Sequence, residues 1–447
     1  MLKNMNTVSV HDIYHASPVF MQHVFTSAYG YKLKRERYSS LYREALKEYV
    51  RGGTDPQELL VRLMHHLNDN IKVYENIEID ENDIIASFKR LPFTDKADLR
   101  YELEDRSYKK GIIRESLTSG TTGANLIVYD SEHDRAKRMA FLDYIKYQNG
   151  VMPFSKRASF TGQELTLPDH DNKLWRFNYT MNQVLYAARY ITPDNVSHVH
   201  ESLERFRPVS MDGSPSALHI LAKYMIRENI TASWDVTAIF PTNEILTPQV
   251  RRDLEKAFDT TVIDQYSTAE GAPFIYSDSR GRYILGDETG LFEFFRKGHH
   301  LYEMVVTTFI NEATPIVRYR IGDQVEMASD AEYLNSFEDD CRIGKIIGRG
   351  ADFLYDSDGN KVNSIIASWI ADELEDVVAH TQFIQEEMGK VIINIVVEED
   401  FTVHHERTLL ERTRKMLGRD VDVTFNYVDS IPKERSGKVR FIINEVE

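Results

Sequence analysis

The first hundred residues have the hydrophobic spacing of helices. In the segments "LYREALKEYV" (41–50) and "PQELLVRLMHHLND" (56–69), apolar residues recur three and four positions apart, which is the period of an amphipathic helix. Pro92 interrupts this pattern, because proline lacks the backbone N–H that a helix interior needs. We therefore expect residues 1–100 to be mainly helical, with a break at Pro92.

From residue 111 onward, short apolar runs alternate with helical stretches. "LIVYD" (126–130) predicts a strand, and Ser131 followed by Asp134 has the form of a capping box at the start of a helix. Three further apolar runs predict strands separated by helices: "PVSM" (208–211), "VTAIF" (236–240) and "TTVID" (260–264). Strand, helix and strand in this order indicate βαβ crossovers and parallel strands.

Parallel strands have a consequence for ligand binding, because ligands bind outside the carboxyl ends of such strands. Three polar segments follow predicted strands: "DGSPS" (212–216), "PTNE" (241–244) and "QYSTAEG" (265–271). We expect these segments to lie at the same edge of one sheet and to line one cleft.

The pattern changes again after "GRGAD" (348–352), which is a glycine-rich hinge candidate. The elements expected beyond it are a helix at 364–376, a strand at 391–397, a helix at 404–418, a strand at 421–428, and a basic loop that enters a last strand. We therefore predict a large α/β N-terminal domain (1–349) with parallel strands and βαβ units. A small, mobile α+β C-terminal domain (350–447) is expected to follow it.

Composition narrows the class of protein. The 447 residues include 54 basic and 70 acidic side chains, a formal charge of −16, which argues against nucleic acid or an anionic membrane as a partner. The longest apolar run, at 391–397, is too short for a membrane span, and the first twenty residues lack the apolar core of a signal peptide. We expect a cytoplasmic protein. A single cysteine, Cys341, excludes an internal disulfide or a cysteine-based zinc site.

Several segments could carry chemistry, although each has an ordinary structural explanation. "TSGTTG" (118–123) combines two glycines with hydroxyl residues, which suits either a phosphate-binding backbone nest or a tight turn. It is not the loop of nucleoside triphosphatases, which ends in Gly-Lys-Ser/Thr. Lys438 in "PKERSGK" fits either a cation that a short flexible turn delivers to a ligand or part of a solvated basic tail. Glu270 and Asp323, each beside a glycine, fit either carboxylates that bind sugar hydroxyls or Mg²⁺, or acids that cap a turn.

The order of these segments is more specific than any one of them. Six segments follow one another along residues 95–447: "TSGTTG", "NE", "QYSTAEG", "YRIGD", "GRGAD" and "PKERSGK". This series resembles the adenylate-forming superfamily, which includes acyl–coenzyme A synthetases, adenylation domains of peptide synthetases, and luciferases. The chain length and the segment from residue 182 to 222 look like the phenylacetate–coenzyme A ligase-like group, in its branch linked to polysaccharide-biosynthesis clusters.

The resemblance implies a two-step reaction. A carboxylate attacks the α-phosphate of ATP with Mg²⁺ present, giving an acyl-adenylate and pyrophosphate. The C-terminal domain then rotates, and an acceptor takes the acyl group. Three hypotheses stay open for this chain: transfer to the thiol of coenzyme A, transfer to an amine such as an amino acid or amino sugar, and a non-catalytic member that binds a nucleotide or acts in assembly. The acid and the oligomeric state are not specified by these motifs.

The resemblance also implies a role for each matching residue. The phosphates would be held by Ser119, Gly120, Thr121, Thr122 and Gly123. The adenine would be contacted by Tyr266, Gln265, Thr242, Asn243 and Glu244. The ribose would be held by Asp323 and Arg349, Mg²⁺ by Glu270, and the reacting α-phosphate and carboxylate by Lys438. The hinge would include Ala351 and Asp352.

Some positions depart from the usual pattern of the superfamily. Ala124-Asn125 stand where a Lys-Pro or similar pair is usual, Ser267 where glycine is usual, and Ala269 where a phosphate-binding hydroxyl is usual. Losing one such hydrogen bond costs about 1.5–3 kcal/mol, so we expect adenylation to survive. Ala351 also departs from the usual hinge residues, and residues 356–368 lack the proline and the glutamate that usually follow the hinge. We expect these C-terminal differences to affect the second step more than the first.

The acyl group has no clear signature in this sequence. Aromatic and small residues near the predicted strand ends could contact it, and ordinary core packing explains the same residues. The candidates are Phe160, Trp175, Phe177 and Ser214.

Overall fold

The structure of the chain is a computed structural model. It describes residues 10–111, 113–118, 126–163, 165–166, 173–349, 353–359, 361–363, 374, 377–432 and 440–446. The expectations for the helix at 364–376, for residues 119–123, for Ala351 and Asp352, and for Lys438 lie outside these residues.

Helices dominate the first hundred residues, as predicted. They are α1 (Val10–Ala16), α2 (Val19–Arg37), α3 (Ser40–Val50), α4 (Pro56–Asn70), η1 (Lys72–Tyr74), η2 (Glu81–Asp83), α5 (Ile84–Lys89) and α6 (Lys96–Tyr101). The Asp55 side chain accepts a hydrogen bond from Gln57 N at 2.9 Å, which caps α4. Pro92 lies in the break between α5 and α6.

A hairpin frames the predicted phosphate loop. Strands β1 (Arg114–Thr118) and β2 (Leu126–Asp130) pair antiparallel, with Thr118 opposite Leu126. Helix α7 (Glu132–Gln148) then begins with the predicted capping box: Asp134 N donates to Ser131 Oγ at 3.1 Å, and Ser131 N donates to Asp134 Oδ2 at 2.8 Å. Residues 119–125 therefore connect two paired strands.

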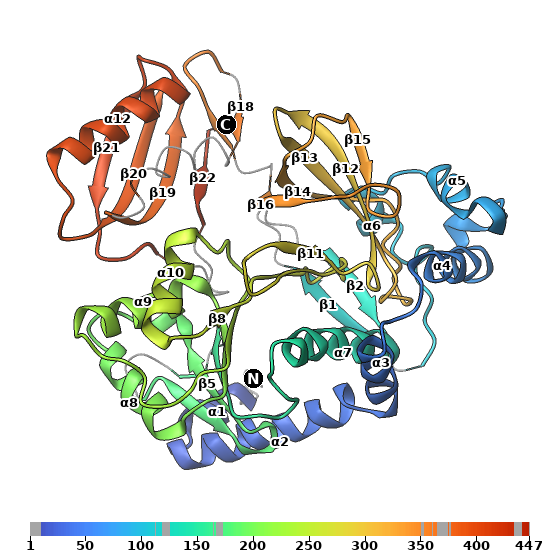
Figure 1. Cartoon of the computed structure of the whole chain (residues 1–447), viewed down its shortest axis with the longest axis horizontal. Helices are drawn as coiled ribbons and strands as arrows, with labels where there is room; N and C mark the ends of the chain where they lie inside the picture. Colours follow the sequence, from blue (N-terminus) through green and yellow to red (C-terminus); the bar gives the residue numbers. More distant parts are fainter. Residues whose placement is uncertain are drawn as a thin grey trace, which may run out of the picture.

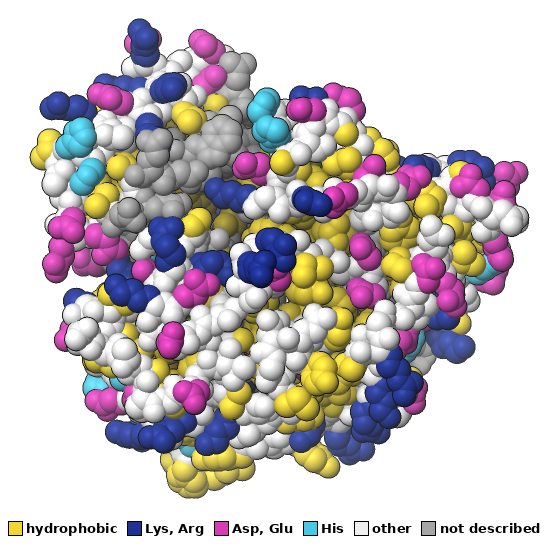
Figure 2. Space-filling view, in the orientation of Figure 1, with side chains coloured by type: hydrophobic (Ala, Val, Ile, Leu, Met, Phe, Trp, Pro, Cys, Tyr) yellow, Lys and Arg dark blue, Asp and Glu magenta, His cyan; other side chains and the backbone are white. Residues whose placement is uncertain are grey.

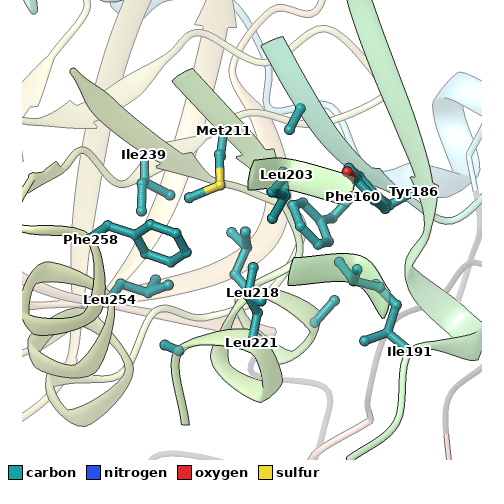
Figure 3. Close-up of a cluster of buried hydrophobic side chains, with 14 of the residues drawn as sticks. Phe160, Tyr186, Ile191, Leu203, Met211, Leu218, Leu221, Ile239, Leu254 and Phe258 are labelled. Carbon is teal, nitrogen blue, oxygen red and sulfur yellow. The ribbon is translucent and has the colours of Figure 1, made fainter. Parts of the chain in front are cut away.

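The largest sheet has the predicted parallel strands. Its order is β4-β5-β3-β6-β7-β8, and all pairs are parallel except β4 with β5. The elements of this region are β3 (Arg157–Thr161), β4 (Trp175–Asn178), η3 (Tyr179–Met181), β5 (Gln183–Ala187), η4 (Ala188–Tyr190), α8 (Val196–Phe206), β6 (Ser210–Gly213), α9 (Pro215–Arg227), β7 (Ala238–Pro241), α10 (Pro248–Phe258) and β8 (Thr261–Val262). Apolar side chains of the sheet and of α8, α9 and α10 form one buried cluster (Figure 3).

Two antiparallel sheets follow that the sequence did not lead us to expect. The three-stranded sheet is β11-β10-β9 and the five-stranded sheet is β15-β12-β13-β14-β16. Their strands are β9 (Gln265–Tyr266), β10 (Ile275–Ser277), β11 (Tyr283–Leu285), β12 (Gly290–Gly298), β13 (Leu301–Thr308), β14 (Tyr319–Met327), β15 (Tyr333–Asn335) and β16 (Ile343–Arg349).

The C-terminal part forms its own sheet and core. Its elements are β17 (Phe353–Tyr355), β18 (Lys361–Asn363), β19 (Val378–Glu387), β20 (Lys390–Val397), α12 (Val403–Leu417), β21 (Asp422–Tyr427) and β22 (Ile442–Asn444), with a four-stranded sheet in the order β21-β20-β19-β22. The predicted strands in 391–397 and 421–428 and the helix in 404–418 are present. A buried cluster is drawn wholly from residues 354–442.

Contacts join this C-terminal part to the parallel sheet region through α9 (Figure 1). Lys223 forms an ion pair with Glu398, and the rings of His219 and His380 lie 5.6 Å apart, edge to face. Charged side chains of both signs are distributed over the visible face (Figure 2). Among the helices described, none combines the length and the apolar character that crossing a membrane would require.

Candidate functional site

Two of the predicted ligand-binding segments meet at the carboxyl ends of β6 and β7. Thr242 N donates to Gly213 O at 2.9 Å, which extends the parallel register past the ends of the strands. The Glu244 carboxylate accepts from Ser216 N and from Ser216 Oγ, both at 3.0 Å. Segments 212–216 and 241–244 therefore lie side by side at one edge, as the parallel topology predicts.

Glu244 has a structural partner that its motif did not indicate. Pro215 is the first residue of α9 and has no N–H, so Ser216 N is an early unsatisfied donor of the helix. Glu244 satisfies this donor. The Ser214 hydroxyl, at the N-cap position of the helix, makes no cap hydrogen bond. Between Thr242 and Glu244, Asn243 is exposed and has a left-handed φ of 76°, so a tight turn sets the path of this loop.

The residues expected around the nucleoside come together from three strands. The Tyr266 hydroxyl on β9 donates to Asp323 Oδ2 on β14 at 2.6 Å. The backbone of Arg349 on β16 pairs with Asp323 in the antiparallel register. Asp323 is only 8% exposed. A short hydroxyl–carboxylate hydrogen bond of this kind fixes the orientation of both side chains.

Two predicted site residues keep a buried polar atom without a partner. Gln265 Nε2 and Ser214 Oγ have no hydrogen bond within the described part of the chain, although both residues are buried. Native proteins leave few buried polar atoms unpaired, and such atoms often mark a functional position. Both follow strands of the parallel sheet, at the edge where a ligand is expected.

Glu270 lies in a closed turn beyond β9. Gly271 N donates to Thr268 O at 3.2 Å, and Ala272 N donates to Thr268 Oγ1 at 3.4 Å. The Glu270 side chain is buried, and it makes no hydrogen bond to any residue that the structure describes. A single carboxylate that is not committed elsewhere fits Mg²⁺, which is usually bound by one or two carboxylates together with substrate phosphates.

Two residues beside Glu270 were not singled out from the sequence. Arg138 of α7 lies near Glu270, whose charge acts on its guanidinium. Asn311 follows β13 and is almost completely buried. Neither Arg138 nor Asn311 lies in a recognisable sequence motif, so only the folded structure shows that they are close to Glu270.

The candidate acyl-pocket aromatics have ordinary packing partners. Phe160 is 2% exposed and stacks on Tyr186, with ring centroids 4.9 Å apart (Figure 3). Trp175 and Phe177 lie on the edge strand β4, where Phe177 N donates to His23 Nδ1 of α2 at 3.1 Å. All three side chains also pack in or against the buried cluster of the parallel-sheet region, and their contact with an acyl group stays a prediction.

The described residues on either side of the segment that carries Lys438 lie close to the rest of the protein. Before it, Ile431 is 4% exposed. After it, Arg440 O accepts from Gln382 Nε2 of β19 at 2.8 Å. Residues 433–439 lie outside the described residues, as do Ser119 to Gly123, for which the structure gives the two framing strands.

A cavity of about 420 Å³ lies between α3, α4 and the end of β13, and its lining includes Lys137 of α7 and Asn311. His133, Asp134 and Glu312 place ligand atoms within 4.8 Å of one another near it. Glu312 is already paired with His133 at 3.2 Å and with Lys137 at 3.0 Å. Both Asp134 oxygens accept backbone N–H groups. The charges in this cluster are satisfied within the protein, so we assign it no metal.

Burial works to raise the pKa of Glu312, but the hydrogen bond from His133 and the charge of Lys137 outweigh it. They hold the pKa of Glu312 at about 2. Glu312 is therefore a charged structural link between α7 and the β13–β14 connection.

Comparison with solved structures identifies the fold. The chain is similar to 2-hydroxyisobutyryl-CoA ligase in the postadenylation state in complex with R3-HIB-AMP, with a TM-score of 0.62 and 17% identity over 87% of this chain and 88% of that chain. The same ligase in an open conformation with 2-HIB-AMP and CoA gives a TM-score of 0.51 and 16% identity, over 87% and 90%. The fold is that of an adenylate-forming ligase, with a large N-terminal and a smaller C-terminal domain, as predicted.

Comparison of sequences identifies the family. A model described as the CapK C-terminal domain matches residues 354–445. Protein CapK of Staphylococcus aureus is 31% identical over 448 residues, which cover 97% of this chain and 99% of that protein. An identity of this level over nearly the whole of both chains shows common descent, and the chain belongs to the CapK family.

Proposed function

We propose that this protein activates a carboxylic acid with ATP, forms an acyl-adenylate and releases pyrophosphate. The observation that carries this proposal is the contact between Tyr266 and Asp323, with the backbone of Arg349 beside it. Tyr266 would stack on the adenine while its hydroxyl holds Asp323 in position for the ribose hydroxyls. A ligase of the same fold has been solved with an acyl-AMP bound.

The phosphates would lie between the β1–β2 loop and the turn of Glu270. In this proposal the hydroxyls and backbone N–H groups of Ser119 to Gly123 hold the β- and γ-phosphates. Glu270 would hold Mg²⁺, which would supply charge neutralisation when bound. The base would be read by Gln265, whose Nε2 has no partner among the described residues, and by the backbone of Thr242 and Asn243.

Lys438 would supply the cation at the α-phosphate. It lies in the C-terminal domain, for which we propose the range 350–447 with the hinge at Ala351 and Asp352. The contacts between α9 and this domain, Lys223 with Glu398 and His219 with His380, would hold it against the N-terminal domain during adenylation. When the domain leaves, the cation leaves with it, and the acceptor can approach.

We propose the thiol of coenzyme A as the acceptor. The same ligase fold has been solved with both an acyl-AMP and CoA. An amine acceptor would give an amide instead, so the product distinguishes the two.

The proposal is tested by mass spectrometry of the reaction mixture. The enzyme is incubated with ATP, Mg²⁺ and a broad panel of carboxylic acids without an acceptor, and bound acyl-AMP is measured. Coenzyme A or a panel of amines is then added. Acyl-AMP followed by a thioester is the expected result. An amide would overturn the acceptor assignment only, and the absence of acyl-AMP with every acid would support a non-catalytic protein.

A further inference from the structure

A cation of the N-terminal domain packs against the turn that carries Glu270. A Cβ atom added to Gly271 would lie 2.6 Å from Arg138 Nη2. Arg138 therefore touches the backbone directly after Glu270, and it does so because Gly271 has no side chain. The left-handed φ of 92° at Gly271 also favours glycine at this position.

Asn311 directs a second donor to the same place. The added Cβ at Gly271 would lie 3.1 Å from Asn311 Nδ2. Asn311 Oδ1 accepts from Thr314 N at 3.2 Å, which sets the orientation of the amide group. Its Nδ2 is buried and has no hydrogen-bond partner among the residues that the structure describes. Two donor nitrogens thus converge on one side of Gly271.

The carboxylates whose charges act on Arg138 are largely committed to other groups. Asp130 accepts from Ser116 Oγ at 2.5 Å and pairs with Arg135. The oxygens of Asp134 accept the N–H groups of Ser131, Glu312 and Ala313. Only Glu270 has no such partner within the described residues.

Arg138 itself makes no hydrogen bond or ion pair at contact distance within the described chain. Burial lowers the pKa of its guanidinium, and the charges of Asp130, Asp134 and Glu270 oppose this effect. The guanidinium stays charged in proteins, and a desolvated charge without hydrogen bonds is costly. An anion bound at this point would remove that cost.

We propose that Arg138 and Asn311 form an oxyanion site beside Glu270 and Gly271 that takes the diphosphate end of ATP and the pyrophosphate product. This inference rests on the proposed adenylation function and extends it. Guanidinium groups match phosphate oxygens well. Because α7 and Asn311 belong to the N-terminal domain, this cation stays in place when the domain carrying Lys438 departs. It also supplies the fixed positive charge that "TSGTTG" lacks.

The test compares the full-length enzyme with Arg138→Gln and Asn311→Asp. Asn311→Asp keeps the acceptor for Thr314 N but loses the Nδ2 donor. Lys137→Gln is the matched control, since it removes the same charge one residue away on α7, from a side chain that is already paired with Glu312. Binding of magnesium pyrophosphate, ATP and AMP is measured by titration calorimetry, and the KM for pyrophosphate is measured in isotope exchange.

We expect Arg138→Gln and Asn311→Asp to weaken pyrophosphate and ATP binding at least tenfold. AMP, which lacks the diphosphate, should bind within twofold of the wild type in every variant. Lys137→Gln should leave all three ligands within twofold. Arg138→Lys should recover part of the loss. Equal weakening of AMP and pyrophosphate would mean that Arg138 is only structural and would overturn the site.

Failure of this site is distinguishable from failure of the proposed function. Acid-dependent exchange in the wild type with unchanged pyrophosphate binding in Arg138→Gln overturns the site and leaves the function standing. Pyrophosphate binding that depends on Arg138 without any acyl-AMP supports the site and rejects the function. If Arg138→Gln shows no cooperative unfolding transition, pyrophosphate binding by Arg138→Lys and Asn311→Asp is compared with binding by Lys137→Gln. Weaker binding in the first two variants supports the site, and equal binding in all three overturns it.

Discussion

At the scale of single residues, the hydrogen bond between Tyr266 and Asp323 is the most informative contact. The two residues are 57 positions apart and belong to different sheets, yet their side chains meet at 2.6 Å. Tyr266 thus has two tasks in the proposed site, since its ring would cover the base and its hydroxyl orients the carboxylate. A substitution that separates the two tasks tests the assignment.

Tyr266→Phe keeps the ring and removes the donor to Asp323. Hydrogen bonds to charged groups contribute about 1.5–3 kcal/mol, so we expect the KM for ATP to rise about tenfold or more in pyrophosphate exchange. The KM for the acid should change less than twofold.

Tyr283→Phe is the matched control for that variant, because the Tyr283 hydroxyl donates to Asp264 Oδ2 at the same distance of 2.6 Å. It should lower stability without changing the KM for ATP. If both variants raise this KM equally, the Tyr266–Asp323 contact is not specific to the nucleotide.

At the scale of elements, the start of α9 depends on a side chain from the neighbouring strand end. Glu244 accepts two hydrogen bonds from Ser216, and it thereby links the loop after β7 to the helix after β6. This carboxylate and the hydrogen bond from Thr242 N to Gly213 O hold together the two loops that would contact the nucleotide.

Glu244→Ala should lower the free energy of unfolding by about 1–2 kcal/mol, because Ser216 N and Oγ lose their acceptor. Glu244→Gln keeps one acceptor oxygen and should recover about half of that loss. Urea unfolding monitored by circular dichroism measures both values. Equal stability of Glu244→Ala and the wild type would show that water replaces the carboxylate without cost.

Glu312 makes a similar link between α7 and the β13–β14 connection, and its effect depends on pH. Because its folded pKa of about 2 lies below the ordinary value of 4.5, its contribution is fully present above pH 4.5 and is lost as the pH falls through about 2. The side chain is 42% exposed, so solvent screening reduces the contribution to about 1 kcal/mol.

We therefore expect Glu312→Gln to lower unfolding free energy at pH 7, and to lower it less at pH 3. The exposed Glu58, paired with Arg62 on α4, provides the control, and Glu58→Gln should change stability little. If Glu312→Gln lowers the free energy of unfolding more at pH 3 than at pH 7, the pH dependence has the opposite sign and contradicts this assignment.

At the scale of the whole molecule, the C-terminal domain rests on α9 through the Lys223–Glu398 pair and the His219–His380 contact. If this docked arrangement serves adenylation, placing like charges across the pair should slow it. We expect Lys223→Glu to lower the rate of pyrophosphate exchange a few-fold, in keeping with about 1 kcal/mol for a partly exposed ion pair.

Adding Glu398→Lys to Lys223→Glu restores opposite charges and should restore the rate. A double variant no faster than either single variant would show that this contact does not form in the adenylating state.

Much of this architecture could be predicted from the sequence because it is encoded locally. The spacing in α3 and α4, the capping box of α7, and the strand–helix rhythm of β6 to β8 are short patterns that each specify one element. The carboxyl-end rule then placed 212–216 beside 241–244 without any other knowledge.

The remaining features depend on contacts between distant parts of the chain. The five-stranded antiparallel sheet pairs β12 with both β13 and β15, and no local pattern specifies that order. Arg138 and Asn311 are ordinary helix and loop residues until Gly271 is brought against them. The role of Glu244 at the start of α9 depends on Pro215 of a different segment, which has no N–H and leaves Ser216 N as the donor.

The central claim, that this member of the CapK family forms an acyl-adenylate, is tested most directly by isotope exchange between pyrophosphate and ATP. We expect exchange that requires one class of acid and Mg²⁺, and that falls at least a hundredfold in Lys438→Ala while the variant still binds ATP. Exchange that is unchanged in Lys438→Ala, or exchange that no acid in a broad panel supports, would contradict it.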